Sequence, residues 1–333
     1  MKKLFKPVIA ILLVLVCQQA FAQQNDWEKK EKKRYPFVKE RNISKTYPAG
    51  NTLNIDNSFG DVIVTIGGNE IKVDIHIEAS STEEQMAQRA FDNLDVTDSK
   101  EGSQVKFKTT TNKNEKKNGD YKCNNCSVNM TINYAVQVPA GTPLNIDNSF
   151  GAINIPDYTG EVDLTSKFGS LTTGSLAKTK QVHVEFGKAD IKSTADASYT
   201  FKFSTIAIGS LEGDVKMNVE FCNMSRITMG TGLSSLDLKE SYSTIGLKPA
   251  VNLSVSYDIT TSFGSFKNKT STEIKRTDEP DRYGDFDKTY SGKSGSGSTR
   301  VKIRSSFGNV ILGDASDEEL KEKKKGKSDG KEI

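Results

Sequence analysis

Short runs in which apolar and polar residues alternate recur along most of the chain, with an aromatic residue at a regular interval among them. The octapeptide LNIDNSFG occurs twice without change, at Leu53–Gly60 and Leu144–Gly151. Alternation with a period of two predicts half-buried β-strands. Weaker copies of the octapeptide follow, and the aromatic residues of the series are Phe150, Phe168, Phe186, Phe203, Phe221, Tyr242, Phe263 and Phe307.

From Phe150 to Phe263, successive members of this series lie roughly 17 to 21 residues apart, a steady spacing that predicts a solenoid. Each coil of a solenoid buries its apolar side only by stacking on the next coil. We therefore expect an all-β solenoid of about 18–21-residue coils, with the aromatic rings in a ladder up the inside at about 4.8 Å spacing. Glycine follows six of the phenylalanines, as at Gly151 and Gly169, and is expected to permit a tight turn beside the ring. An antiparallel sandwich is the alternative.

Residues 1–22 have the pattern of a cleaved secretory signal. Three lysines precede the apolar run Val8–Val16, and Ala20-Phe21-Ala22 fits a cleavage site. The apolar run is too short for a membrane span, and no later run reaches about 18 apolar residues. We expect export across the inner membrane to the periplasm, the outer-membrane surface or the medium, with no transmembrane helix. Lipidation at Cys17 is the alternative, although Val16 stands where a small residue is wanted.

Charge argues against nucleic acid as a partner. The whole chain has 46 basic and 43 acidic residues. The signal holds three of the lysines and no acid, so the mature chain keeps 43 residues of each kind. A neutral chain has no net field that would attract a polyanion.

The segments around the repeats differ in composition. Residues 23–44 form a charged lead-in. Residues 45–143 hold the first coil and an insertion, with a helix near 81–94 where Ser81 and Glu84 have capping-box spacing. We expect this insertion to cap the open end of the array, because an unpaired sheet edge invites aggregation. Residues 144–313 form the solenoid, interrupted by a loop at 268–299, and residues 314–333 form a disordered charged tail.

Cys123 and Cys126 lie in a Lys/Asn-rich loop of the insertion. In an exported protein a local disulfide is the expected state of two such cysteines. A zinc site needs about four ligands, and Cys222, His76 and His183 are scattered along the rest of the mature chain. We therefore expect no metal site and no cofactor.

Two further groups of side chains are candidates for function. The loop 268–299 carries Tyr283, Phe286 and Tyr290, which either bind a partner or pack on the last coil. An enzyme would need acids and bases gathered on adjacent coils, whereas the carboxylates that qualify occupy different parts of their coils: Asp147, Asp163, Glu185 and Asp190. We therefore expect no catalytic residues.

Calcium ligation is the alternative use of the acidic pairs Asp56-Asn57 and Asp147-Asn148. The same residues are good turn formers, and the turn is the expected role.

Together, an export signal, a strand ending in VPAG at Val138–Gly141, LNIDNSFG and the train of FG repeats resemble the bacterial putative-adhesin family of secreted β-solenoid proteins. The resemblance covers roughly residues 43–313 and is most specific at Val138–Gly151 and Val301–Gly313. It implies a right-handed parallel β-helix in the cell envelope, a handedness that agrees with the rule for parallel crossovers. It implies no catalytic residues.

Three functions follow from these observations. The preferred one is a non-enzymatic envelope protein, an adhesin or surface module that binds a glycan or another envelope protein. The second is a periplasmic scaffold or sensor of an envelope-stress system. The third is a polysaccharide lyase or hydrolase, because parallel β-helices host such enzymes, an analogy that rests on fold alone.

Overall fold

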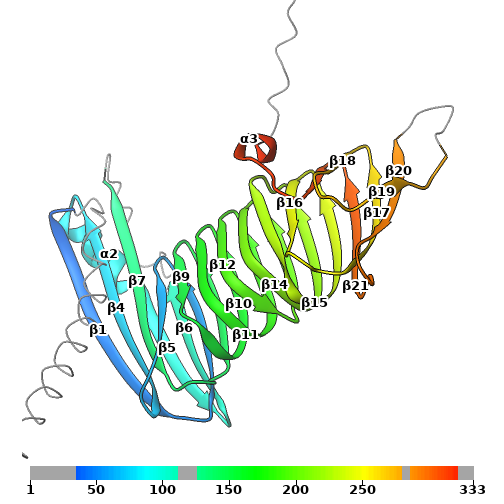
Figure 1. Cartoon of the computed structure of the whole chain (residues 1–333). Helices are drawn as coiled ribbons and strands as arrows, with labels where there is room; N and C mark the ends of the chain where they lie inside the picture. The colour runs from blue at the N-terminus through cyan, green and yellow to red at the C-terminus, as the bar shows by residue number, and fades with distance from the viewer. Residues whose placement is uncertain (1–34, 112–125, 280–285, 322–333) are drawn as a thin grey trace, which may run out of the picture.

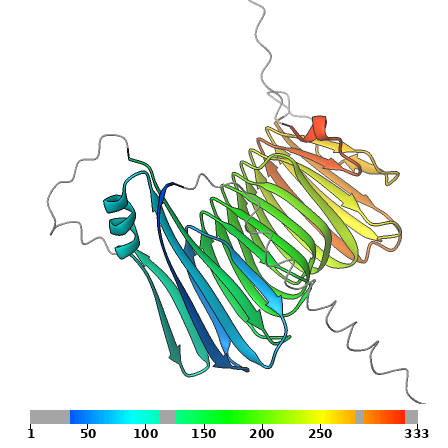
Figure 2. The ribbon, with the colours of Figure 1, turned by 90° about the vertical axis from the view of Figure 1, so that its left-hand side faces the viewer.

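A computed structural model describes residues 35–111, 126–279 and 286–321. The fold is all-β, and the described strands join into a single 22-stranded sheet. Figures 1 and 2 show most of the strands stacked one behind the next along one axis. The predicted signal at 1–22, Cys123 and Tyr283 lie outside the described residues.

Parallel strands in the stack form two columns. In column A, which begins at its N-terminal end with β6, each strand pairs in parallel with the next. Leu164, for example, faces Val182 of the next repeat, and Val182 faces Tyr199 of the repeat after that. The strands of column A up to β15 are β6 (Gln104–Thr111), β2 (Thr52–Ser58), β8 (Leu144–Ser149), β10 (Tyr158–Lys167), β11 (Ser170–Glu185), β13 (Ser198–Lys202), β14 (Thr205–Glu220) and β15 (Ser225–Ser241).

Column B is a second parallel stack, and the first halves of the long strands β11, β14 and β15 belong to it. Leu171 in β11 lies between Ile153 of the preceding repeat and Ala189 of the following one. The predicted period is therefore the offset between paired strands. The other strands of column B are β7 (Val128–Val138), β3 (Val62–Ile66), β9 (Ala152–Ile155), β12 (Lys188–Ala195), β16 (Thr244–Pro249), β22 (Asn309–Leu312) and β18 (Ser265–Asn268).

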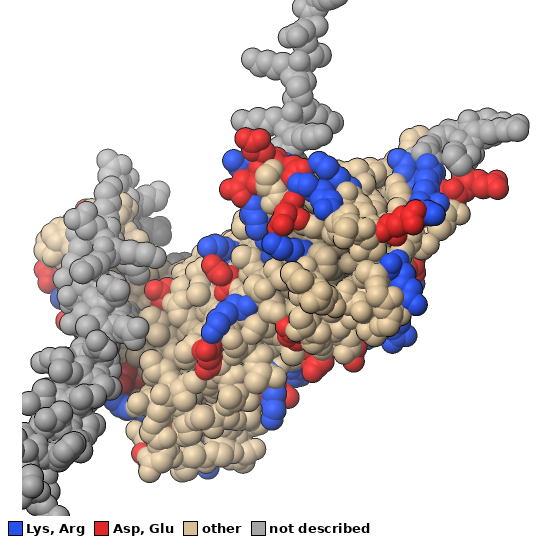
Figure 3. Space-filling view, in the orientation of Figure 1, with Lys and Arg blue, Asp and Glu red and all other residues tan. Residues whose placement is uncertain are grey.

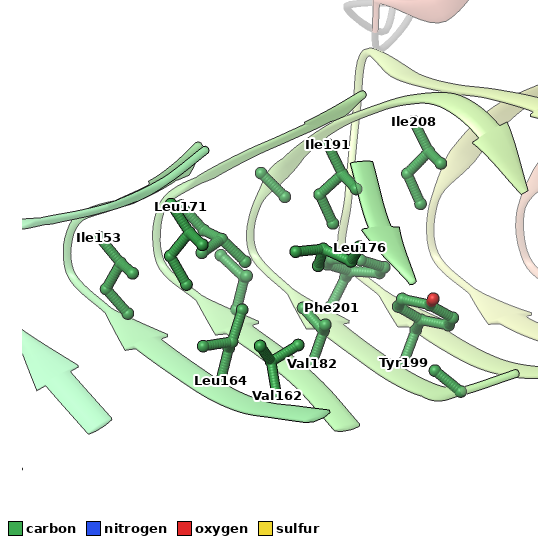
Figure 4. Close-up of a cluster of buried hydrophobic side chains, with 14 of the residues drawn as sticks. Ile153, Val162, Leu164, Leu171, Leu176, Val182, Ile191, Tyr199, Phe201 and Ile208 are labelled. Atoms are coloured by element: carbon green, nitrogen blue, oxygen red, sulfur yellow. The ribbon is translucent and has the colours of Figure 1, made fainter. Parts of the chain in front are cut away.

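The core lies between the two columns. Because side chains alternate along a strand, each strand contributes every second residue to it. Figure 4 shows Ile153, Leu171 and Ile191 of column B together with Leu164 and Val182 of column A. These five side chains are at most 1% exposed.

The last repeats are out of sequence order. Strands β21 (Thr299–Ser306) and β22 pair with β15 and β16 on one side. On their other side they pair with β17 (Val255–Ser262) and β18. The final repeat is therefore inserted between two earlier ones and does not close the array. Instead, β20 (Asp287–Lys293) lies antiparallel on β17, and β19 (Ile274–Arg276) lies antiparallel on β20.

Antiparallel pairs occupy the N-terminal end. β1 (Phe37–Pro48) pairs with β4 (Glu70–Ser81), β4 pairs with β7, and β5 (Leu94–Glu101) pairs with β6. Helix α2 (Glu84–Asp92) packs on β1, β4 and β7. Its N-cap is Glu83 and makes no side-chain capping bond, so the predicted capping box at Ser81 and Glu84 does not form. The Ser81 hydroxyl instead accepts a hydrogen bond from the backbone of Glu83.

Both charged ends contribute ordered elements, although the tail after Asp314 was predicted to be disordered. Residues 37–44 of the lead-in belong to β1, whose Ile43 packs against the core. The segment after Asp314 forms the short helix α3 (Asp317–Leu320), in which Leu320 is buried. Glu319 forms ion pairs with Lys267 and Lys269. Within the described residues, no helix has both the length and the apolar character needed to cross a membrane.

Candidate functional site

The aromatic series forms a ladder on the outside of the stack. Neighbouring rings lie nearly parallel, with interplanar angles of 2–8° and centroids 4.7–5.5 Å apart from Phe59 to Phe263. The rings from Phe150 to Phe263 are 44–55% exposed. The predicted spacing is confirmed, whereas the predicted position inside the solenoid is wrong.

Backbone geometry explains the outward position. All nine aromatic residues of the ladder, Phe59 and the eight from Phe150 to Phe307 in the series, have a φ between +49° and +69°. This left-handed conformation disfavours side chains with a Cβ, at a cost of roughly 1 kcal/mol or more per residue. It breaks the alternation of the strand at a corner between column A and column B, so the ring points away from the core.

Where glycine follows the aromatic residue at a corner, it is needed for a different reason from the predicted one. A Cβ on Gly169 would lie 1.9 Å from the carbonyl oxygen of Gly151, and one on Gly187 would lie 2.1 Å from that of Gly169. Glycine is therefore required by the close approach of the neighbouring repeat, while the aromatic residue itself adopts the positive φ.

The order of the ladder follows the order of the strands. Phe307 lies between Tyr242 and Phe263, with centroids 4.9 and 5.0 Å away. Phe286 then stacks on Phe263 at 4.8 Å, and Tyr290 packs against Phe266 at 5.1 Å. Phe286 and Tyr290 thus pack on the array, which is the alternative that the sequence offered to a binding loop.

Stacking restricts what the ladder can bind. Each inner ring has a neighbour on both faces, so only ring edges reach solvent. A sugar stacks on the face of an aromatic ring, and the inner rings offer no free face. The ladder is therefore a long apolar stripe, and it does not form a row of sugar-stacking platforms.

A separate hollow of about 450 Å³ lies on the outer face of column A, where β6, β2, β8 and β10 run side by side. The strand register places its polar side chains in two rows. One row contains Lys108, Asp56, Asp147 and Thr165, and the other contains Lys106, Asn54, Asn145 and Asp163.

Two of the three carboxylates in the hollow are neutralised by lysines. Lys108 lies 3.2 Å from Asp56, and Lys180 lies 3.2 Å from Asp163. Asp147 forms no ion pair among the described residues. Partial desolvation raises the pKa of the Asp147 carboxyl above its usual range although this residue is exposed, and the charge of Asp56 raises it further, while Lys167 and His183 act in the opposite direction.

A chain of amide side chains fixes the second row. Asn145 donates a hydrogen bond to Asn54 at 2.7 Å, and Asn54 donates to Gln104 at 2.9 Å and to the carbonyl of Val105 at 3.1 Å. These bonds orient both asparagines before any ligand arrives. A hydrogen-bonding surface that is already ordered loses less entropy on binding.

The structure brings together only two of the four carboxylates that were weighed, and not favoured, as catalytic candidates. Asp147 and Asp163 share the hollow although they occupy different positions in their repeats. Glu185 lies one residue before the ladder at the end of β11, and Asp190 lies in column B and pairs with Lys188. Lys106, Lys108, Asn54 and Asn145 were not predicted. The identical copies of LNIDN could have revealed the two asparagines, because alternation places the second and fourth residues of each copy on one face.

The acidic pairs do not form a common ligand set. Asn57 and Asn148 are buried and bonded to each other at 2.9 Å, whereas Asp56 and Asp147 point outward. Cys222 is buried, and burial raises the pKa of its thiol to about 11. Cys126 is disulfide-bonded, and its pairing with Cys123 stays a prediction.

His76 meets Glu40 and Glu78 on the outer face of β1 and β4, with donor atoms within 4.8 Å of one another. The His76 imidazole also lies 2.8 Å from the side chain of Asn42. Exposed acidic groups gather in this way without an ion, so this cluster carries no metal assignment.

Charges of both signs are intermixed on the face shown in Figure 3, and acidic and basic groups gather together around α3. Arg226 pairs there with Asp317, and Lys248 pairs with Asp314 at 2.7 Å. This distribution agrees with the balanced charge of the sequence.

Comparison with known proteins gives similarity to solved structures only. No protein-family model and no curated protein matches the chain. One similar structure is a putative cell adhesion protein from Clostridium sporogenes, with 12% identity, coverage of 83% of this chain and 99% of that chain, and a TM-score of 0.23. A putative adhesin from Bacteroides fragilis has 11% identity, coverage of 82% and 97%, and a TM-score of 0.37.

A third similar structure is a putative lipid binding protein from Parabacteroides distasonis, with 13% identity, coverage of 84% and 98%, and a TM-score of 0.37. At these identities and TM-scores, the similarities carry no argument about what this chain binds.

Proposed function

We propose that this protein is an exported, non-enzymatic binding module of the bacterial cell envelope. In this proposal the stack is a right-handed β-solenoid that holds a hydroxyl-rich polymer, such as a glycan, in the hollow of column A. Export rests on the signal pattern of residues 1–22. The solenoid rests on parallel pairing at the repeat period, and its hand rests on the general preference of parallel crossovers.

The observation that carries the proposal is the ordered polar lining of the hollow. The bonded amides of Asn54 and Asn145 lie beside the carboxylate of Asp147 and the hydroxyl of Thr165. These groups offer donors and acceptors at the strand spacing of about 4.8 Å, which suits a chain of sugar hydroxyls. Three carboxylates and two lysines line the hollow, so a neutral or weakly charged polymer fits it better than a polyanion.

Affinity electrophoresis tests this function. The wild-type protein is run in native gels that contain dextran, xylan, alginate, hyaluronan or soluble peptidoglycan fragments. At least one of these polymers should retard it. Asn145→Ala removes an outward amide from the hollow and should abolish the retardation. Asn154→Ala is the matched control, because Asn154 lies in β9 of the same repeat but in column B. Equal retardation of Asn145→Ala and the wild type would overturn the proposal.

A hydrolase is the second candidate, favoured by one observation. Asp147 and Asp163 line the same hollow, and glycosidases use two carboxylates that flank the scissile bond. The raised pKa of Asp147 is a property of a general acid. The second carboxylate, Asp163, is already engaged in an ion pair with Lys180, which favours a binding module over a hydrolase. Release of reducing ends by the wild type, but not by Asp147→Asn, would establish the enzyme instead.

Location distinguishes an adhesin from a periplasmic scaffold or sensor. An epitope tag at the C-terminus can be followed during protease treatment of intact cells, with a periplasmic protein as control. Loss of the tag while the control survives supports a surface module. Protection of both until the outer envelope is opened supports the scaffold or sensor.

A further inference from the structure

The exposed ladder is large enough to be an interface. Aromatic side chains present on the order of 150–250 Å² each when fully accessible. The eight rings from Phe150 to Phe263, including Phe307, are about half exposed, which leaves on the order of 800 Å² of apolar stripe. This is roughly the area that each partner contributes to a standard protein interface, and it exceeds the largest patch of most monomers.

The stripe has a period that a second copy matches. From Phe59 to Phe263 the ring centroids repeat at 4.7–5.5 Å, close to the strand spacing, over roughly 40 Å. A partner stays in register along this length only if its own surface repeats at the same distance. A second copy of this chain carries the same stripe and therefore has the same period.

Charges beside the stripe select one orientation for the second copy. The residues that immediately precede Phe168, Phe186, Phe203 and Phe221 are Lys167, Glu185, Lys202 and Glu220. They occupy adjacent strands of column A in that order. Lys202 and Glu220 pair within the chain at 3.1 Å.

A column with alternating signs is complementary to itself when reversed. A two-fold axis between Glu185 and Lys202 would bring Lys167 of one copy opposite Glu220 of the other. The same axis would bring Glu185 opposite Lys202. A shift by one repeat would oppose like charges, so the column fixes the register as well as the direction.

The same axis also fits the rings and the other side of the stripe. It places four rings, Phe59 to Phe186, opposite the four from Phe203 to Phe307. On the column B side, Lys188 would face Thr205, and no like charges would meet.

We infer that two copies of this chain associate antiparallel through the aromatic stripe, with the Lys167–Glu220 column paired across the two-fold axis. This interface is separate from the ligand hollow and does not depend on the proposed function. It is isologous, as expected for a homodimer.

Zero-length carbodiimide cross-linking tests the arrangement directly. Lys167 and Glu220 of one chain are three strand spacings apart, roughly 14 Å, which is too far for a zero-length link. A Lys167–Glu220 cross-linked peptide in the dimer band is therefore diagnostic of the antiparallel pair. The Lys202–Glu220 link forms within one chain and is the internal control. A dimer band that contains the control link but no Lys167–Glu220 link would overturn the proposal.

Charge variants give an independent readout in sedimentation equilibrium. Lys202→Glu places like charges opposite Glu185 and should weaken dimerisation about tenfold or more. Adding Glu185→Lys restores opposite charges across the axis and should recover the dimer. The double variant Phe186→Asn and Phe203→Asn removes two central rings at corners where asparagine tolerates the positive φ, and it should be monomeric. Circular dichroism shows whether each variant is folded.

A wild-type protein that remains monomeric up to about 100 µM would overturn the inference. If that monomer also bound vesicles of phosphatidylcholine, and the double asparagine variant did not, the stripe would be a lipid-binding surface instead.

Discussion

Ser305 on β21 donates a hydrogen bond to the buried carboxyl group of Glu240 on β15, although 65 residues separate the two along the chain. The second carboxyl oxygen accepts the backbone N–H of Ser243 at 2.6 Å. A Cβ on Gly308 would lie 1.8 Å from a Glu240 oxygen. The inserted repeat therefore supplies both a hydroxyl partner and the space that this carboxyl group occupies.

The Glu240 carboxyl group should make stability depend on pH. Burial raises its pKa to about 7 from an ordinary value of 4.5, while the bonds from Ser305 and Ser243 oppose the rise. Because the folded state holds the proton more tightly, stability should fall as pH rises from about 4.5 to about 7, by up to roughly 3 kcal/mol.

Glu240→Gln keeps the shape of the side chain but cannot ionise. Urea titrations at pH 5 and pH 8 measure the unfolding free energy. Between these two pH values it should fall much less in Glu240→Gln than in the wild type. Glu220→Gln is the control, because Glu220 is only half-buried and its pKa is lowered by the hydrogen bond from Lys202, and this variant should retain the decrease. An unchanged decrease in Glu240→Gln would contradict the assignment.

The order of the last repeats can be tested with engineered disulfides. Ser241, Ser306 and Ser262 are neighbours in that order across β15, β21 and β17. Cysteines at 241 and 306 lie at adjacent strand positions and should form a bond on oxidation. Cysteines at 241 and 262 are about 9.6 Å apart across the inserted strand, beyond the reach of a disulfide. Mass spectrometry that finds the 241–262 bond, and no 241–306 bond, would show that the repeats follow sequence order.

Two phenylalanines in one repeat should respond differently to truncation. Phe201 is fully buried, whereas Phe203 is 46% exposed in the ladder. Phe201→Ala should therefore cost about 3 to 5 kcal/mol of unfolding free energy. Phe203→Ala loses two stacking contacts and should cost only about 1 to 2 kcal/mol.

Phe203→Gly separates the stacking from the backbone strain. It loses the same ring contacts but relieves the positive φ of 49°, so it should be no less stable than Phe203→Ala. Chemical denaturation of the three variants provides the comparison. Equal costs for Phe201→Ala and Phe203→Ala would mean that the ring of Phe203 is buried.

The interval between aromatic residues was sufficient to predict parallel pairing between strands of successive repeats. The interior position of the ladder was predicted wrongly, because aromatic residues were assumed to lie inside. Alternation along the strand supports the same error, since it places Phe168 on the side of the buried Ser166, and only a break at the corner turns the ring outward. That break is the positive φ of the ladder residue. Aromatic residues disfavour a positive φ, so the sequence gives no direct sign of it.

The strand order at the C-terminal end could not be predicted from local sequence. β17 ends in TSFG and β21 continues into SSFG, so either strand could pair with β15. Contacts between distant residues distinguish them. Arg304 of β21 forms an ion pair with Asp237, and the hydroxyl of Thr299 donates to the carbonyl of Leu233 at 2.8 Å. The hollow shows the same limit, because Lys108 reaches Asp56 only after β6 pairs with β2.

Isothermal titration with the polymer that most retards the wild type is the most direct test of binding in the hollow. We predict saturable binding by the wild type and by Asn154→Ala, at least about tenfold weaker binding by Asn145→Ala, and no shortening of the polymer. Equal affinities for all three proteins would place the ligand elsewhere, and shortening of the polymer would show that the protein is an enzyme.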